Sequence, residues 1–106
     1  MNINDYQRET AKTNKMADYI EYFMLGLGGE TGELFNKFKK ILRDEDGEVT
    51  RDHVEAMSLE LGDIAWYWVR LVDALGLDAG DVLQQNLDKL NARFEKGTIG
   101  GSGDNR

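Results

Sequence analysis

Two pairs of acidic residues stand at a spacing that suits a metal site. Glu30 and Glu33 form one pair and Glu60 and Asp63 the other, each with two residues between its members. Residues three apart are neighbours on a helix surface, so each pair would present two carboxylates together. Four convergent carboxylates repel one another unless a hard cation such as Mg²⁺ lies between them. The alternative is two solvated acidic faces, because the chain has 20 Asp and Glu residues.

Helices must position these carboxylates, and the sequence predicts an all-α chain. Proline is absent, and apolar residues recur at a spacing of three and four. We expect helices over about residues 3–13, 16–42, 51–75 and 79–94, the second either continuous or interrupted at Gly28 and Gly29. Thr50 or Asp52 would cap the third helix, and Gly76 would end it.

The apolar residues of the last three helices form one-sided stripes that predict the core. On the second helix these are Ile20, Phe23, Met24, Leu27, Leu34, Phe38 and Ile41; on the third, Val54, Met57, Leu61, Ile64, Ala65, Trp68, Leu71, Val72 and Leu75; on the fourth, Val82, Leu83, Leu87, Leu90 and Phe94.

The acidic pairs lie beside these stripes, rotated in the same sense. At about 100° per residue, Glu30 and Glu60 lie roughly 70–80° from the stripe centres, and Glu33 and Asp63 roughly 130–140°. The short charged loop over residues 43–48 predicts that the two helices are antiparallel neighbours. The pairs then face each other if the second helix lies on one side of the third, and point apart if it lies on the other.

Composition excludes several classes of protein. The 106 residues carry a net charge of −7 and no cysteine, which excludes thiol catalysis and disulfide scaffolds and argues against binding to a nucleic-acid polymer. Neither a secretory signal nor a run of about 20 apolar residues is present, so we expect a cytoplasmic protein without a membrane partner. A chain this short that carries many aromatic residues predicts a homo-oligomer.

Four glycines crowd one stretch of the second predicted helix. Gly26, Gly28, Gly29 and Gly32 lie within seven residues, and each costs about 1 kcal/mol relative to alanine inside a helix. Close approach of another backbone or of a ligand would explain them. The alternative is a loop that joins two shorter helices.

These features together resemble the MazG nucleotide pyrophosphohydrolase family of the all-α NTP pyrophosphatases. The family pattern is ExxE, a spacer and ExxD, and 26 residues separate Glu33 from Glu60 here. The resemblance extends from about Asp5, with Tyr6 and Gln7, to the C-terminus. It is carried by the segments LGLGGETGE at 25–33, ELGDIAWY at 60–67 and NLDKLNAR at 86–93, and by Lys37 and Lys40.

The resemblance implies a four-helix-type bundle protomer over residues 1–96, completed as a dimer or tetramer, with a glycine-rich tail at 97–106. It also implies hydrolysis of nucleoside triphosphates, NTP or dNTP, to the monophosphate and pyrophosphate, in housekeeping of the nucleotide pool. Mg²⁺, or Mn²⁺ in its place, would be held by Glu30, Glu33, Glu60 and Asp63. Glu30 and Glu33 would be the catalytic carboxylates, with Glu33 the candidate general base.

Further residues are candidates for substrate binding. Lys37 and Lys40 would bind phosphate oxygens, or Lys37 would pair with Glu33 four residues before it. Trp66 or Tyr67 would stack on the base or fill an oligomer interface.

The last helix and the tail offer a second set of candidates. Asn86, Lys89 and Arg93 share one helix face, and Asn86 falls within the apolar stripe, where it would recognise the base or sugar or tie two helices together. We expect His53 on the surface rather than as a ligand. Residues 104–106 would fold over a bound nucleotide or stay disordered.

Two other functions remain open at the level of sequence. The chain would be a non-catalytic helical interaction module if its acidic pairs were solvated. Alternatively, the same hydrolase scaffold would be specialised for a deoxynucleotide or a phosphoribosyl-nucleotide, since the choice of base and sugar depends on the shape of the pocket.

Overall fold

The computed structural model describes residues 1–97, and helices dominate them. Helix α1 spans Ile3–Thr10 and runs into a short 3₁₀ helix, η1, at Ala11–Thr13. Helix α2 spans Ile20–Asp44, α3 spans Arg51–Ala74 and α4 spans Ala79–Lys96. The all-α fold predicted from the sequence is confirmed. The predicted tail lies outside the described residues from position 98 onward.

Local capping signals set the ends of α3. The hydroxyl of Thr50 accepts a hydrogen bond from the backbone N–H of His53, and the Thr50 N–H donates to His53 Nδ1 at 3.0 Å. This exchange satisfies backbone groups that the first turn would leave open. Gly76 follows the other end with a φ of 76°, a conformation that glycine adopts without strain. Both ends were predicted from the sequence.

The predicted start of the second helix was wrong, because α2 begins at Ile20 and not near Met16. The Asn14 side chain donates to the Ala17 carbonyl at 2.7 Å and accepts from the Met16 N–H at 3.1 Å. Ala17 has a φ of 49°, which a right-handed helix does not allow. Such side-chain bonds to the backbone compete with helix formation. From Ile20 onward α2 is continuous, so the alternative of two shorter helices is excluded.

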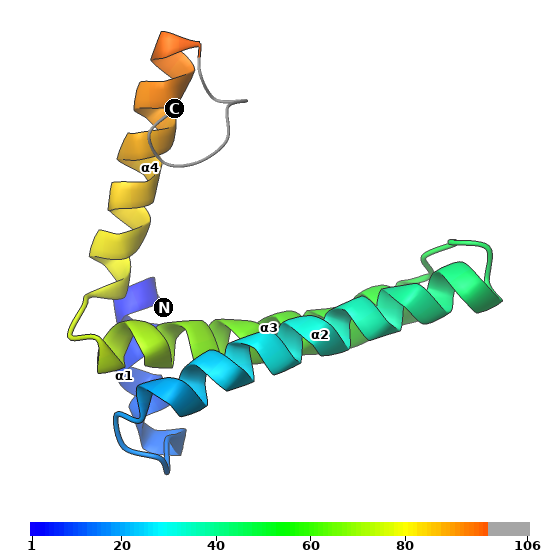
Figure 1. The fold of residues 1–106 in the computed structure, drawn as a ribbon, viewed down its shortest axis with the longest axis horizontal. Helices are drawn as coiled ribbons and strands as arrows, with labels where there is room; N and C mark the ends of the chain where they lie inside the picture. The colour runs from blue at the N-terminus through cyan, green and yellow to red at the C-terminus, as the bar shows by residue number, and fades with distance from the viewer. Residues whose placement is uncertain (98–106) are drawn as a thin grey trace.

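Helices α2 and α3 form a long antiparallel hairpin (Figure 1). Helix α1 lies at the end of the hairpin remote from the α2–α3 loop, and α4 leaves that same end and points away from the hairpin (Figure 1). The predicted antiparallel pairing is therefore present. The short loop that joins α2 to α3 favours this arrangement.

A buried polar network fixes α1 against the hairpin. Arg70 of α3 is 2% exposed, and it donates to Thr10 Oγ1 at 3.0 Å and to the Gln7 carbonyl at 2.5 Å. The Gln7 side chain donates to Asp73 Oδ1 at 2.9 Å and accepts from the Ala79 N–H at 2.7 Å. Buried polar groups of this kind need all their partners, so α1, α3 and the start of α4 are held in one arrangement.

A small core lies beside this network. Val69, Val72 and Ala79 are buried, and Tyr6 and Trp68 pack against them. Trp68 thus lies at the core, as predicted. No helix in residues 1–97 combines the length and the apolar character that crossing a membrane requires.

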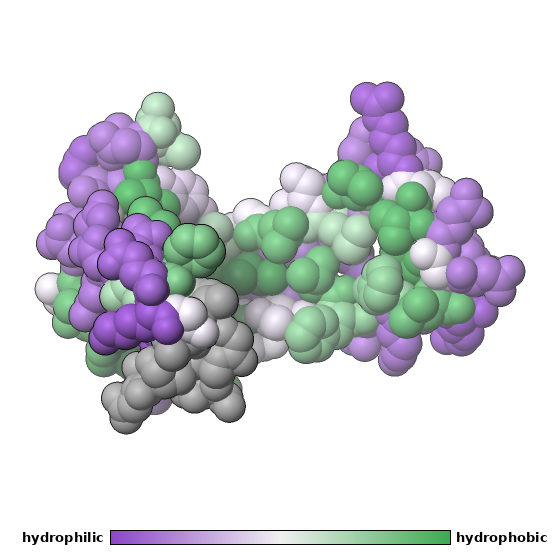
Figure 2. Space-filling view, turned by 90° about the horizontal axis from the view of Figure 1, so that it is seen from above, coloured by the Kyte–Doolittle hydropathy of each residue, from purple (hydrophilic) through white to green (hydrophobic). Residues whose placement is uncertain are grey.

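Part of the predicted core faces outward instead. The hairpin has only two helices, so each apolar stripe is covered along one side, and α4 points away from it (Figure 1). Figure 2 shows hydrophobic side chains gathered over the hairpin. The stripe residues found exposed are Met24, Phe38, Val54, Leu61, Leu75, Leu83, Leu87 and Phe94.

Candidate functional site

Three carboxylates from the two arms of the hairpin meet at one place. Glu30 comes from α2, and Glu60 and Asp63 come from α3. One carboxylate oxygen from each lies within 4.8 Å of the others, a spacing that would hold a metal ion. The antiparallel arrangement has α2 on the side of α3 that brings the acidic pairs together.

Glu33 stands apart from this group. Its side chain is exposed, and it does not belong to the set of three oxygens. Its negative charge still reaches Glu30, because it contributes to raising the pKa of that carboxyl group. The structure thus brings together three of the four predicted ligands and leaves Glu33 beside them.

The Glu60 side chain is only 18% exposed. Its Oε1 lies 3.8 Å from Lys37 Nζ. Its Oε2 is buried and has no hydrogen-bond partner. A buried carboxylate oxygen without a partner is costly, and a bound cation would satisfy it.

The pKa of Glu30 is raised above that of an ordinary glutamate. The largest cause is a hydrogen bond with the Glu60 carboxylate, which only the protonated form of Glu30 can donate; burial and the negative charges of Asp63, Glu60 and Glu33 add to it. Without a cation, Glu30 therefore keeps its proton to a higher pH than an ordinary glutamate does. In their ionised form the three carboxylates offer hard oxygen donors that fit a divalent ion such as Mg²⁺, whose binding would displace that proton.

A cavity of about 330 Å³ opens beside the carboxylates. It is lined by Thr13, Glu30, Asp63, Trp66 and Tyr67. The Trp66 indole N–H donates to Thr13 Oγ1 at 2.8 Å, which links the end of η1 to the wall of the cavity. Trp66 and Tyr67 stand edge to face, with ring centroids 5.0 Å apart. Aromatic walls next to acidic oxygens suit a ligand with a flat ring and a charged, metal-bound part.

Two tyrosine hydroxyls near the cluster stay protonated to higher pH than usual. Burial, followed by the negative charge of Asp63, raises the pKa of Tyr6. A hydrogen bond with Tyr22, followed by burial, raises the pKa of Tyr67. Thr13 and Tyr22 had no pattern that singled them out in the sequence, because only the fold brings Thr13 to this cavity and Tyr22 against Tyr67.

The crowded glycines have one clear steric cause within residues 1–97. A Cβ added at Gly26 would lie 2.1 Å from Cε1 of the Tyr67 ring, whereas one added at Gly28, Gly29 or Gly32 would meet nothing within 4 Å. The predicted close approach is therefore present at Gly26, and the approaching group is an aromatic side chain.

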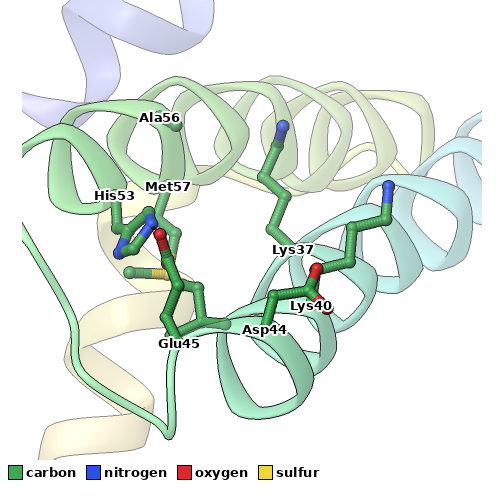
Figure 3. A pocket seen from close by; sticks show the side chains of 8 residues that line it. Lys37, Lys40, Asp44, Glu45, His53, Ala56 and Met57 are labelled. Atoms are coloured by element: carbon green, nitrogen blue, oxygen red, sulfur yellow. Dashed lines mark ion pairs between the residues drawn. The ribbon is translucent and has the colours of Figure 1, made fainter.

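Lys37 and Lys40 line a second cavity, nearer the α2–α3 loop, of about 220 Å³ (Figure 3). Lys37 bridges to Glu60 of α3 instead of pairing with Glu33 on its own helix. His53 also lines this cavity and is half-buried; its Nε2 lies 2.6 Å from Glu45 Oε2.

The substrate-binding candidates of α4 do not reach the carboxylates within one protomer. Asn86 and Lys89 line a separate cavity of about 370 Å³ that shares no residue with the first. Asn86 is exposed, so its predicted place in a buried stripe was wrong. Arg93 is 5% exposed. Helix α4 points away from the hairpin, which accounts for the separation (Figure 1).

Comparison with known proteins supplies the family. Residues 19–98 match the MazG nucleotide pyrophosphohydrolase domain. The chain belongs to the MazG family. The matched range contains the three clustered carboxylates, Glu33 and both lysines, whereas Tyr6 and Thr13 precede it.

A curated relative of this MazG protein comes from a bacterial virus. The chain is 47% identical over 87 residues to "Gene 37 protein" of Mycobacterium phage L5, an alignment that covers 82% of this chain and 76% of the phage protein. No solved structure matches the chain. Membership of the MazG family indicates nucleotide pyrophosphohydrolase activity in general, and the acidic cluster is a possible site for the divalent metal that this family typically uses.

Proposed function

We propose that this MazG protein is a Mg²⁺-dependent nucleoside triphosphate pyrophosphohydrolase that acts in housekeeping of the nucleotide pool. The reaction is hydrolysis of NTP or dNTP to the monophosphate and pyrophosphate. The observation that carries the proposal is the meeting of Glu30, Glu60 and Asp63 within 4.8 Å, with one buried Glu60 oxygen unsatisfied. Such a site would hold Mg²⁺ against the triphosphate.

The carboxylates of the site have separate roles in the proposed reaction. Glu30, Glu60 and Asp63 hold the cation, which, when bound, neutralises phosphate charge and increases the acidity of water. Glu33, exposed beside the cluster, is the general base. It takes the proton from the water whose oxygen forms the new bond to the α-phosphorus. The bond from that phosphorus to the bridging oxygen breaks, and pyrophosphate leaves with the electron pair.

Other residues position the nucleotide. Trp66 and Tyr67 form the wall for the base, since they line the cavity that Glu30 and Asp63 share. Lys37 and Lys40 supply positive charge for phosphate oxygens. The third group of candidates, Asn86, Lys89 and Arg93, lies on α4.

We infer that the protein works as a homo-oligomer, a dimer or tetramer. Helix α4 points away from its own hairpin, so Asn86 and Lys89 would reach a nucleotide on a hairpin from a neighbouring copy (Figure 1). Arg93, which is 5% exposed, would have to be uncovered before it could do the same. Apolar side chains exposed along α2 and α3 support the same arrangement, since burying them against another copy removes them from water.

A panel of the four NTPs and four dNTPs with Mg²⁺ tests the proposed activity by release of pyrophosphate. We expect turnover of at least one nucleotide, and a loss of about 100-fold or more in kcat/KM for Asp63→Asn, which removes a metal ligand and keeps the side-chain shape. Glu55→Gln is the matched control, because Glu55 is also on α3 but is 71% exposed and pairs with Arg51.

The panel also separates the alternatives. Pyrophosphate from deoxynucleotides alone would make the protein a deoxynucleotide specialist. If folded protein releases no pyrophosphate from any nucleotide, the proposed function is wrong and a non-catalytic helical module is favoured. If Asp63→Asn retains the wild-type rate, the proposed metal site is wrong.

A further inference from the structure

The ion pair between Lys37 and Glu60 places a protein cation at the candidate metal site. Lys37 Nζ lies 3.8 Å from Glu60 Oε1. The pair joins α2 to α3, and Glu60 is also one of the three clustered carboxylates. In Figure 3, Lys37 extends away from Glu45 and His53, which form their own pair at the other side of the cavity.

The contact is loose enough to be exchanged. A distance of 3.8 Å allows an ion pair but exceeds the 2.7–3.2 Å of an N–H···O hydrogen bond. The Lys37 side chain is 40% exposed, whereas that of Glu60 is 18% exposed. A lysine has a flexible stem, so its ammonium can move while the confined carboxylate stays in place.

The Lys37–Glu60 ion pair does not satisfy the whole carboxylate cluster. Lys37 faces Glu60 Oε1, and the buried Oε2 still has no partner. Glu30 and Asp63 add further negative charge within 4.8 Å. One ammonium therefore offsets part of the charge without satisfying the cluster, and a divalent cation on the same carboxylate would repel it.

We propose that Lys37 is an exchangeable counter-ion of the site: its ammonium neutralises Glu60 when no metal is bound, leaves that carboxylate when a divalent cation binds, and then contacts the phosphate of the nucleotide. The proposal rests on the proposed function for its metal and its substrate. Lys37 then has two anionic partners in turn, first the Glu60 carboxylate and then the phosphate. Metal binding is the step that frees the lysine to contact the phosphate.

Lys39 and Lys40 provide the comparison. Lys40 lines the same cavity as Lys37, but its charge acts on Asp44. Lys39 is exposed on the same helix and has no ion pair described in residues 1–97. Lys39→Met therefore removes one positive charge from α2 without touching Glu60, which makes it the matched control for Lys37→Met.

Titration of the metal-free protein with Mn²⁺, followed by electron paramagnetic resonance of the free ion, measures the competition. We expect Lys37→Met to bind Mn²⁺ about three- to tenfold more tightly than wild type, because a half-exposed ion pair no longer competes. Lys37→Arg keeps the charge and should bind no more tightly than wild type. Lys39→Met should stay within about twofold of it.

The outcomes distinguish the two proposals. If wild type binds Mn²⁺ and Lys37→Met binds it equally or more weakly, the counter-ion proposal is wrong while the metal site stands. If folded wild type binds no Mn²⁺, the metal site of the proposed function fails, and the role of Lys37 fails with it.

Chemical labelling provides a second readout that does not depend on activity. Acetylation with a limiting amount of acetic anhydride, followed by peptide mass spectrometry, reports how free each lysine is. We expect labelling of Lys37 to rise about twofold or more on addition of Mn²⁺, with labelling of Lys39 unchanged. Glu60→Gln should give the higher Lys37 labelling without metal. Unchanged or lower labelling of Lys37 with Mn²⁺ would overturn the proposal.

Discussion

Glu30 and Glu33 lie three residues apart on α2, and only Glu30 joins the carboxylates of α3. Three residues turn a helix by about 300°, so the two side chains point about 60° apart and lie one turn apart along the axis. On α3 the same spacing lets both Glu60 and Asp63 take part. Spacing in the sequence predicted the faces that carry the acids, but which acid reaches the partner helix depends on how the two helices pack.

The raised pKa of Glu30 predicts a pH dependence of stability. A carboxyl group whose pKa is higher in the folded than in the unfolded chain stabilises the fold at low pH, and that contribution is lost as pH rises through the folded pKa. In metal-free protein near pH 7.5, Glu30→Gln should therefore raise the melting temperature by roughly 2–4 °C through loss of like-charge repulsion. The difference in melting temperature between Glu30→Gln and wild type should vanish as the pH falls below the ordinary glutamate pKa. Thermal unfolding followed by circular dichroism from pH 4 to 8 measures it.

Glu33→Gln is the control for that experiment. Glu33 is exposed and outside the three-oxygen group, so we expect a smaller increase. A metal-free Glu30→Gln variant that melts below wild type at pH 7.5 would show that like-charge repulsion on Glu30 does not destabilise the fold.

At the scale of elements, the packing of α2 on α3 depends on one glycine. Gly26 lets the Tyr67 ring approach to where a Cβ would lie 2.1 Å from Cε1. We expect Gly26→Ala to lower the free energy of unfolding by roughly 1–3 kcal/mol, because the ring must move. Gly28→Ala, on the same helix with nothing within 4 Å, should raise it by up to about 1 kcal/mol through helix propensity.

Urea unfolding followed by circular dichroism separates these two variants. Displacement of Tyr67 should also alter the cavity that it lines with Glu30 and Asp63. Equal stability of the two variants would show that the Tyr67 ring does not confine α2.

The ends of the helices were predictable to the extent that their signals are local. Thr50 and Gly76 act within a few residues of their own positions, so the bounds of α3 followed from the sequence. The break after residue 13 was predicted too short, because Lys15, Met16 and Ala17 are ordinary helix formers and only the side-chain bonds of Asn14 reveal the turn.

At the scale of the whole molecule, an apolar groove runs between α2 and α3 away from the carboxylates. It encloses about 620 Å³ and is lined by apolar side chains, among them Phe35, Phe38 and Leu61, with Ser58 the exception. We expect Phe35→Asp to shift the protein from oligomer to monomer in sedimentation velocity, because a charge there would be buried against the second copy. Val49→Asp, an exposed apolar residue in the hairpin loop, should leave the oligomer intact.

A wild-type protein that sediments as a monomer at all concentrations would contradict the oligomer, and an oligomer unchanged by Phe35→Asp would place the contact elsewhere. The sequence predicted the excess of apolar surface but not its location. Phe35 lies off the predicted stripe, and the stripe residues Phe38 and Leu61 face solvent because a two-helix hairpin covers only one side of each helix.

The Gln7 side chain has a consequence for how the chain assembles. Its partners, Asp73, the Leu77 carbonyl and the Ala79 N–H, lie 66 to 72 residues further along the sequence. Contacts between such distant segments close large loops and form late. On the ribosome, the first helix to emerge must therefore wait, undocked, until the whole hairpin and the start of α4 have followed it.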